Sequence, residues 1–138
     1  MHVQSQELWS TGKHTLNCYV STQSKILDKY FYLADDVINH MMVCTIEGVG
    51  AMAVIAVQDR IRVIDGKGKL LYSTQLDSYV TCFDIRPEPS SKGFPLLVFG
   101  TKAGSIGAVE LTTDEAIVLW ECDFTFDGKS SVSHIKVA

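Results

Sequence analysis

The chain has 138 residues, of which 46% are hydrophobic and 20% charged, and its formal net charge is −4 at pH 7. This composition is typical of a globular domain with a packed core and excludes an intrinsically disordered chain. The 12 lysines and arginines form no basic stripe, so we expect no nucleic-acid partner.

Nothing in the sequence indicates membrane insertion or export. The longest apolar run, 49–57, is far shorter than the roughly 20 residues of a membrane-spanning helix, so we expect no direct membrane insertion. The first residues lack the apolar segment of a signal peptide, which predicts a cytoplasmic chain. We expect reduced and buried thiols, because no two of the four cysteines form a Cys-x-x-Cys pair; they are Cys18, Cys44, Cys82 and Cys122.

The first third of the chain predicts strands throughout. Residues 7–20 predict a hairpin, and 21–25 predict a polar loop. The aromatic run 27–34 and the segment 37–46 predict strands on either side of a turn at Asp35 and Asp36. A helix is the weaker alternative for 37–46, because its two methionines are good helix formers.

The middle of the chain follows the same pattern. A second hairpin is expected at 52–64, followed by a glycine-rich turn at 65–68 and a strand at 69–76. Residues 79–85 predict a β-branched and aromatic strand. The Pro- and Ser-rich segment 86–93 predicts a surface loop that could be held against neighbouring subunits.

A third hairpin is expected at 96–111, with a tight turn in which Gly104 takes a positive φ. A strand is predicted at 116–122, a loop at 127–130 and a half-buried strand at 132–137.

The three hairpins recur along the chain. Ser10, Ala56 and Gly100 occupy matching places in them, at a period of about 45 residues, which is typical of propeller blades. We therefore predict an all-β fold, a partial β-propeller of about three blade-equivalents of four-stranded antiparallel sheets. Residues 1–36 would supply three strands of a blade, 37–77 and 78–126 complete blades, and 131–138 the first strand of the next.

Three blades do not close a ring, because closed propellers use about 4–8. The chain is therefore expected to be a segment of a longer protein or to pair with another copy of itself. Cys44 and Cys82 are expected at matching places in the strands that precede hairpins, with His134 in that place in the last strand.

No motif predicts catalysis, a cofactor or a metal. The Gly-Lys-Ser at 128–130 resembles the end of a phosphate loop, but Asp123 stands where that loop needs a glycine. The acidic turns at Asp35–Asp36 and Asp127–Gly128 lack the alternating aspartates of a calcium loop. The four histidines are too scattered for a zinc site, and no histidine is placed beside a nucleophile; they are His2, His14, His40 and His134.

Two pairs of residues have both a structural and a functional interpretation. Trp9 and Trp120 are expected to pack between blades, with partner binding as the alternative. Arg60 and Arg62 share one face of a strand, which is either solvated or paired between blades, or else contacts a partner subunit. Cys44 and Cys82 are expected to be small apolar core residues.

Several runs together resemble a known family. The chain is similar to the amino-terminal propellers of the seventh Bardet–Biedl syndrome protein, a BBSome subunit. The likeness rests on the runs Val-Gln-Asp-Arg-Ile-Arg-Val-Ile at 57–64, Leu-Val-Phe-Gly-Thr-Lys-Ala-Gly at 97–104, Leu-Thr-Thr at 111–113 and Trp-Glu at 120–121. The aromatic strand at 30–33, followed by Asp-Asp-Val-Ile at 35–38, is similar too.

The resemblance implies a non-enzymatic scaffold of a coat-like complex that carries membrane proteins to and from cilia. It also implies other BBSome subunits as partners, especially the second and ninth Bardet–Biedl syndrome proteins, with ciliary membrane-protein cargo bound indirectly. The implied location is the cytoplasm, the cilium, the ciliary basal body and the centrosome. The alternatives are a propeller scaffold of another vesicle-transport, ciliary-transport or signalling complex and, less favoured, a quinoprotein or glycosidase propeller enzyme.

Overall fold

The computed structural model describes residues 6–21, 25–46, 50–86, 94–123 and 135. In these residues the chain forms eleven β-strands, arranged in three antiparallel sheets. The prediction of an all-β chain built from antiparallel sheets of three to four strands is confirmed. The segment 37–46, for which a helix was the alternative, contains a strand. The loops at 87–93 and 127–130 lie outside the described residues, as do His134 and all of the predicted strand 132–137 except residue 135.

The first sheet has three strands and the other two have four. The first contains β1 (Gln6–Thr11), β2 (Thr15–Ser21) and β3 (Ile26–Leu33). The second contains β4 (Ile38–Ile46), β5 (Gly50–Val57), β6 (Arg60–Ile64) and β7 (Leu70–Gln75). The third contains β8 (Val80–Arg86), β9 (Leu96–Thr101), β10 (Ser105–Leu111) and β11 (Ala116–Asp123).

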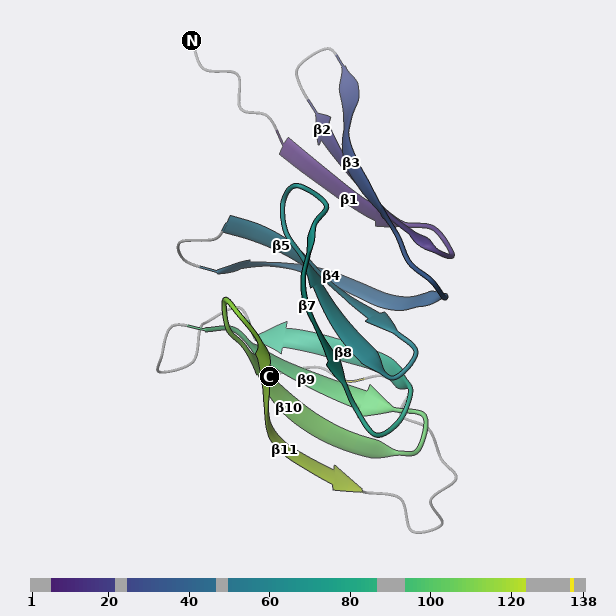
Figure 1. The fold of residues 1–138 in the computed structure, drawn as a ribbon, viewed down its shortest axis with the longest axis vertical. Coiled ribbons are helices and arrows are strands. Elements are labelled where there is room, and N and C mark those ends of the chain that lie inside the picture. Colours follow the sequence, from purple (N-terminus) through teal and green to yellow (C-terminus); the bar gives the residue numbers. More distant parts are fainter. Residues whose placement is uncertain (1–5, 22–24, 47–49, 87–93, 124–134, 136–138) are drawn as a thin grey trace.

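Within each sheet the strands lie side by side in chain order. The three sheets follow one another along the long axis of the molecule (Figure 1). Ser10, Ala56 and Gly100 are each the penultimate residue of the first strand of a hairpin, so their predicted correspondence is confirmed. Short connections allow this arrangement, because antiparallel neighbours need only a tight turn.

Glycines with left-handed backbone shape two of the hairpin turns. Gly104 has a φ of 89°, as the sequence predicted, and its amide donates to the carbonyl of Thr101 at 3.1 Å. Gly68 has a φ of 86° in the turn between β6 and β7, where Asp65 and Lys69 close the hairpin. Glycine suits these turns because it has no Cβ to clash at positive φ.

The core consists of two layers, one on each face of the second sheet. Residues 52–57 of β5 are fully buried, and alternate side chains point to opposite layers because the side-chain period of a strand is two. The layer between the first and second sheets contains Leu16, Ala34, Ile38, Ala53, Ile55, Val57 and Ile64. The layer between the second and third sheets is larger and is centred on Phe83, Phe99, Leu97 and Ile61.

Two expectations about the cysteines are wrong. Cys82 pairs with Gly100, and the residue in that place in the second sheet is His40, which pairs with Ala56. Cys44 instead pairs with Met52, four residues further along β4, so Cys44 and Cys82 occupy equivalent strands but different places. None of the four cysteines forms a disulfide, but only Cys18 and Cys82 are buried, whereas Cys44 is partly buried and Cys122 is exposed.

Candidate interaction surfaces

Backbone hydrogen bonds lock the first sheet to the second. The amide of Ala34 donates to the carbonyl of His14 at 2.8 Å, and the amide of Ile38 donates to the carbonyl of Lys13 at 2.9 Å. The acceptors belong to the β1–β2 turn, and the donors flank the connection to the next sheet. This connection is therefore fixed at both of its ends.

The same arrangement recurs between the second and third sheets. The amide of Leu76 donates to the carbonyl of Asp59 at 2.7 Å, and that of Val80 donates to the carbonyl of Gln58 at 2.9 Å. The acceptors again form a hairpin turn, and the donors again lie four residues apart. These repeated contacts satisfy backbone groups at the ends of the sheets and hold each sheet in place against the preceding turn.

The environment of Arg62 shows which of the interpretations given above for Arg60 and Arg62 applies to it. Its side chain is only 8% exposed, and its Nη2 lies 2.8 Å from Oδ1 of Asp35, in the connection between the first and second sheets. Its Nη1 donates to the hydroxyl of Tyr32 in β3 at 3.2 Å. Arg62 therefore pairs between sheets, whereas Arg60 is exposed, with its Nε 4.0 Å from Asp59. The hydrogen bond from Arg62 lowers the pKa of Asp35.

The second carboxylate of the same connection also has protein partners. Asp36 accepts a hydrogen bond from the amide of Val37 at 2.6 Å and another from the side chain of Gln58. Both carboxylates of the predicted acidic turn thus join neighbouring elements. No group of three or more His, Cys, Asp or Glu residues in the described part of the chain is arranged to hold a metal ion.

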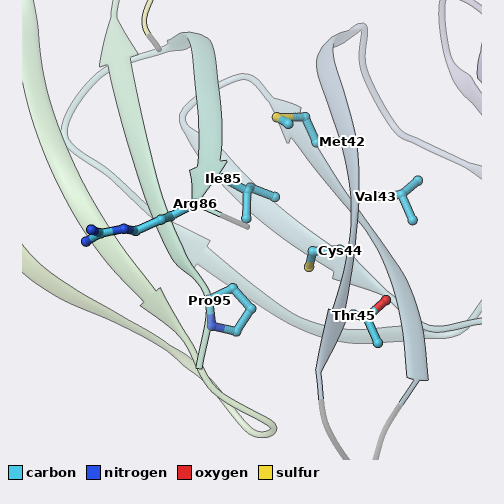
Figure 2. A pocket seen from close by; sticks show the side chains of 7 residues that line it. All are labelled: Met42, Val43, Cys44, Thr45, Ile85, Arg86 and Pro95. Atoms are coloured by element: carbon cyan, nitrogen blue, oxygen red, sulfur yellow. The ribbon is translucent and has the colours of Figure 1, made fainter. Parts of the chain in front are cut away.

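A groove of about 330 Å³ lies between the second and third sheets. Figure 2 shows its lining side chains: Met42, Val43, Cys44, Thr45, Ile85, Arg86 and Pro95. Burial raises the pKa of the Cys44 thiol to about 11, so this thiol stays protonated near neutral pH. A protonated thiol is a poor nucleophile and metal ligand. The groove thus offers a mixed apolar and polar surface and no activated group.

The two tryptophans have different environments. The Trp9 ring packs edge-on against Tyr30, with ring centroids 5.5 Å apart, next to the layer between the first and second sheets. The packing expectation is therefore confirmed for Trp9. It is wrong for Trp120, whose side chain is 47% exposed, because β11 is the last strand of the third sheet and no described sheet covers it.

Sequence reasoning missed the exposed surface of β11. Four consecutive apolar residues of this strand are 38% to 49% exposed; they are Ile117, Val118, Leu119 and Trp120. The signal was present as an uninterrupted apolar run between acidic residues. Periodicity alone did not distinguish it, because a short apolar run is equally typical of a strand buried on both faces.

The described residues contain no helix long and apolar enough to cross a bilayer.

Sheets stacked face to face in chain order, each fixed to the preceding hairpin turn, define a protein of the β-propeller class. A family model described as BBS7 beta-propeller matches residues 1–137, and the chain belongs to this family. A curated relative from Mus musculus, named BBSome complex member BBS7, is 26% identical to the chain over 123 residues. The match covers 88% of the chain and 16% of that relative, so the chain spans only a small part of the relative's length.

Proposed function

We propose that the chain is a non-enzymatic protein-interaction scaffold, a propeller segment of a BBSome-type coat complex that carries membrane proteins to and from cilia. The observation that carries this proposal is the match of the BBS7 propeller family over residues 1–137. The name of the mouse relative, a BBSome complex member, supports the same role.

The fold suits a scaffold for a physical reason. Two apolar layers hold three sheets rigidly, and burial at about 25 cal/mol per Å² of apolar area is the main stabilising contribution. Rigid sheets hold their turns and outer strands in fixed positions, which lowers the entropy cost of binding a partner. We take each sheet as one blade, with limits at 1–36, 37–77 and 78–126, and residues 131–138 as the start of the next.

Other BBSome subunits are the proposed partners, the second and ninth Bardet–Biedl syndrome proteins first among them, and ciliary membrane-protein cargo is reached through the complex. The corresponding location is the cytoplasm, the cilium, its basal body and the centrosome. No nucleic acid, cofactor or metal is part of the proposed function.

Affinity purification of the tagged chain from ciliated cells tests the proposal. We expect BBSome subunits to be recovered with the chain. A V54D variant serves as the unfolded control, because Val54 is fully buried and a carboxylate there has no partner. K102A serves as the matched surface control, because Lys102 is exposed in the β9–β10 turn.

The same experiment separates the alternative scaffolds. Recovery of the subunits of another coat or signalling complex, with no BBSome subunit, would reject the proposed assembly. It would leave a propeller scaffold of that other complex as the function.

A further inference from the structure

The last strand of each sheet, β3, β7 or β11, has a pairing partner on only one side within the described residues. Unpaired edges of this kind attract extended segments of other chains unless polar residues protect them. β3 carries Asp28 and Lys29 in its middle, and β7 carries Ser73, Thr74 and Gln75. Of these three last strands, β3 and β7 therefore have the usual protection.

The edge of β11 lacks this protection. Its central residues Ile117, Val118, Leu119 and Trp120 are apolar and have exposed fractions of 38%, 44%, 49% and 47%. No charged or hydroxyl side chain interrupts this run. The apolar residues of β3 are also exposed, Ile26 at 66% and Phe31 at 67%, but Asp28 and Lys29 separate them. β11 therefore differs from the corresponding strands of the other two sheets in having an exposed apolar run that no polar residue interrupts.

The exposure is not confined to one face of the third sheet. Val118 pairs with Val109, which belongs to the apolar layer toward the second sheet, and Trp120 pairs with Ala108 on the opposite face. Directly opposed residues share a face, and the pairing of β10 with β11 shifts by one residue between Ala108 and Val109. Val118 and Trp120 therefore point to opposite sides, although they are only two residues apart. A further sheet stacked on the third would cover only the side of Trp120. The exposed apolar surface therefore extends over both faces of the third sheet at its β11 edge.

Carboxylates flank the apolar run at both ends. Asp114 and Glu115 precede it and are exposed, and Glu121 follows it. Antiparallel pairing of two copies, with Val118 opposite Val118, would place Glu115 of each copy opposite Glu121 of the other. Like charges at such distances destabilise strand pairing, so this edge disfavours a second copy. The edge favours a segment with positively charged residues at both of its ends.

We propose that the edge of β11 binds an extended partner segment whose apolar residues are flanked on both sides by lysine or arginine. The segment adds to the third sheet as a further strand. Its backbone pairs with that of β11, its apolar side chains cover the exposed run on both faces, and its cations lie beside Asp114, Glu115 and Glu121. The inference rests on the proposed scaffold function, for which it names one partner-binding surface and its chemistry.

A synthetic peptide tests this proposal directly. The probe is a fluorescein-labelled octapeptide with two lysines, then valine, isoleucine, valine and tyrosine, then two lysines, titrated with the 138-residue chain and followed by fluorescence anisotropy. We expect saturable binding that weakens as salt is added, because the flanking charges are exposed. Absence of binding at millimolar chain overturns the proposal.

Two control peptides isolate the two parts of the interaction. Methylation of alternate backbone amides keeps the side chains but removes strand hydrogen bonds, and we expect roughly tenfold or greater loss of affinity. Replacement of the four lysines by glutamates should cause a similar loss through repulsion. Equal affinity for the methylated peptide, or for the glutamate peptide, overturns the proposal.

Variants of the chain locate the site. V118K places a charge in the middle of the edge and should weaken binding roughly tenfold. L70K makes the same charge change on β7, where Leu70 is 39% exposed, and should bind as the wild type does. D114N/E115Q leaves the apolar run intact and should weaken binding at low salt only. Circular dichroism verifies folding, and equal affinity of V118K, L70K and wild type overturns the proposal.

Failure of this proposal is distinguishable from failure of the proposed function. If the chain recovers BBSome subunits from cells but does not bind the lysine peptide, the scaffold function stands and the β11 edge is rejected. If the chain binds the peptide at β11 but recovers no BBSome subunit, the edge site stands and the assembly is rejected.

Discussion

The guanidinium of Arg62, in the centre of the second sheet, lies 2.8 Å from the carboxylate of Asp35, in the connection that leads out of the first sheet. The Arg62 side chain is 8% exposed and that of Asp35 is 72% exposed. The cation is thus buried between two sheets and balanced by a carboxylate at the surface. This ion pair joins the first and second sheets in addition to their apolar layer and backbone hydrogen bonds, and only its cation is buried.

We expect D35A to lower the melting temperature more than R62M does. D35A leaves a buried guanidinium with Tyr32 as its remaining side-chain partner, whereas R62M removes the charge and fills its place with an apolar chain. An unpaired buried charge costs more than its replacement by an apolar residue, so R62M should change the free energy of unfolding by about 1 kcal/mol or less. R60M is the matched control, because Arg60 is exposed. Equal melting temperatures for D35A and wild type would contradict the prediction.

The same pair predicts a pH dependence of stability. The hydrogen bond from Arg62 lowers the pKa of Asp35 below its ordinary value of 3.8. A carboxyl group with a lowered pKa stabilises the folded state above its unfolded-state pKa, and this contribution is lost as the pH falls through the folded-state pKa. The difference in stability between wild type and D35N should therefore be present at about pH 7 and shrink below about pH 4. Urea unfolding across this range measures it, and a constant difference contradicts the assignment.

The four cysteines should react with iodoacetamide at different rates. Cys122 is exposed and should be modified first. Cys44 should react slowly near neutral pH, because its pKa of about 11 leaves little thiolate, and its rate should rise as the pH approaches that value. Cys18 and Cys82 are buried and should react only when the chain unfolds. Peptide mapping by mass spectrometry after timed quenching gives the order, and modification of Cys18 before Cys122 would contradict the fold.

A side chain at position 107 in β10 should lower the stability of the chain, because the space around Gly107 is filled. A Cβ at this position would lie 2.7 Å from Cε1 of Phe99 and 2.8 Å from the carbonyl oxygen of Trp120. Because the second of these atoms is backbone, G107A should destabilise the chain by about 1–3 kcal/mol. G66A is the control, since a Cβ there meets nothing closer than 3.5 Å. Equal effects of G107A and G66A in thermal unfolding would show that the contact of β9, β10 and β11 is looser than described.

Local chemistry made much of the fold predictable. Short β-branched and aromatic runs, separated by turns with glycine and aspartate, predicted the strands from 7 to 122, and Gly104 has the positive φ that its turn requires. The matching places of Ser10, Ala56 and Gly100 follow from the sequence alone, because one structural unit recurs. The family resemblance rested on the same runs and is confirmed by the family match.

Register and interfaces were less predictable. Cys44 and Cys82 occupy equivalent strands whose pairing shifts at the same place, yet Cys44 lies four residues further along its strand and has a different partner. Both arginines of β6 were expected to share one environment, but only Arg62 lies opposite Asp35. Such differences depend on which residue of another sheet lies nearby, and a one-dimensional pattern contains no such information.

The sequence by itself determined the strand content, the hairpin turns and the repeat, because these follow from backbone preferences and a side-chain period of two within a few neighbouring residues. Only the tertiary structure decided that Arg62 is buried between sheets and that the apolar run of β11 is exposed. An apolar strand is buried or exposed according to whether another sheet covers it, and that depends on residues distant in the chain.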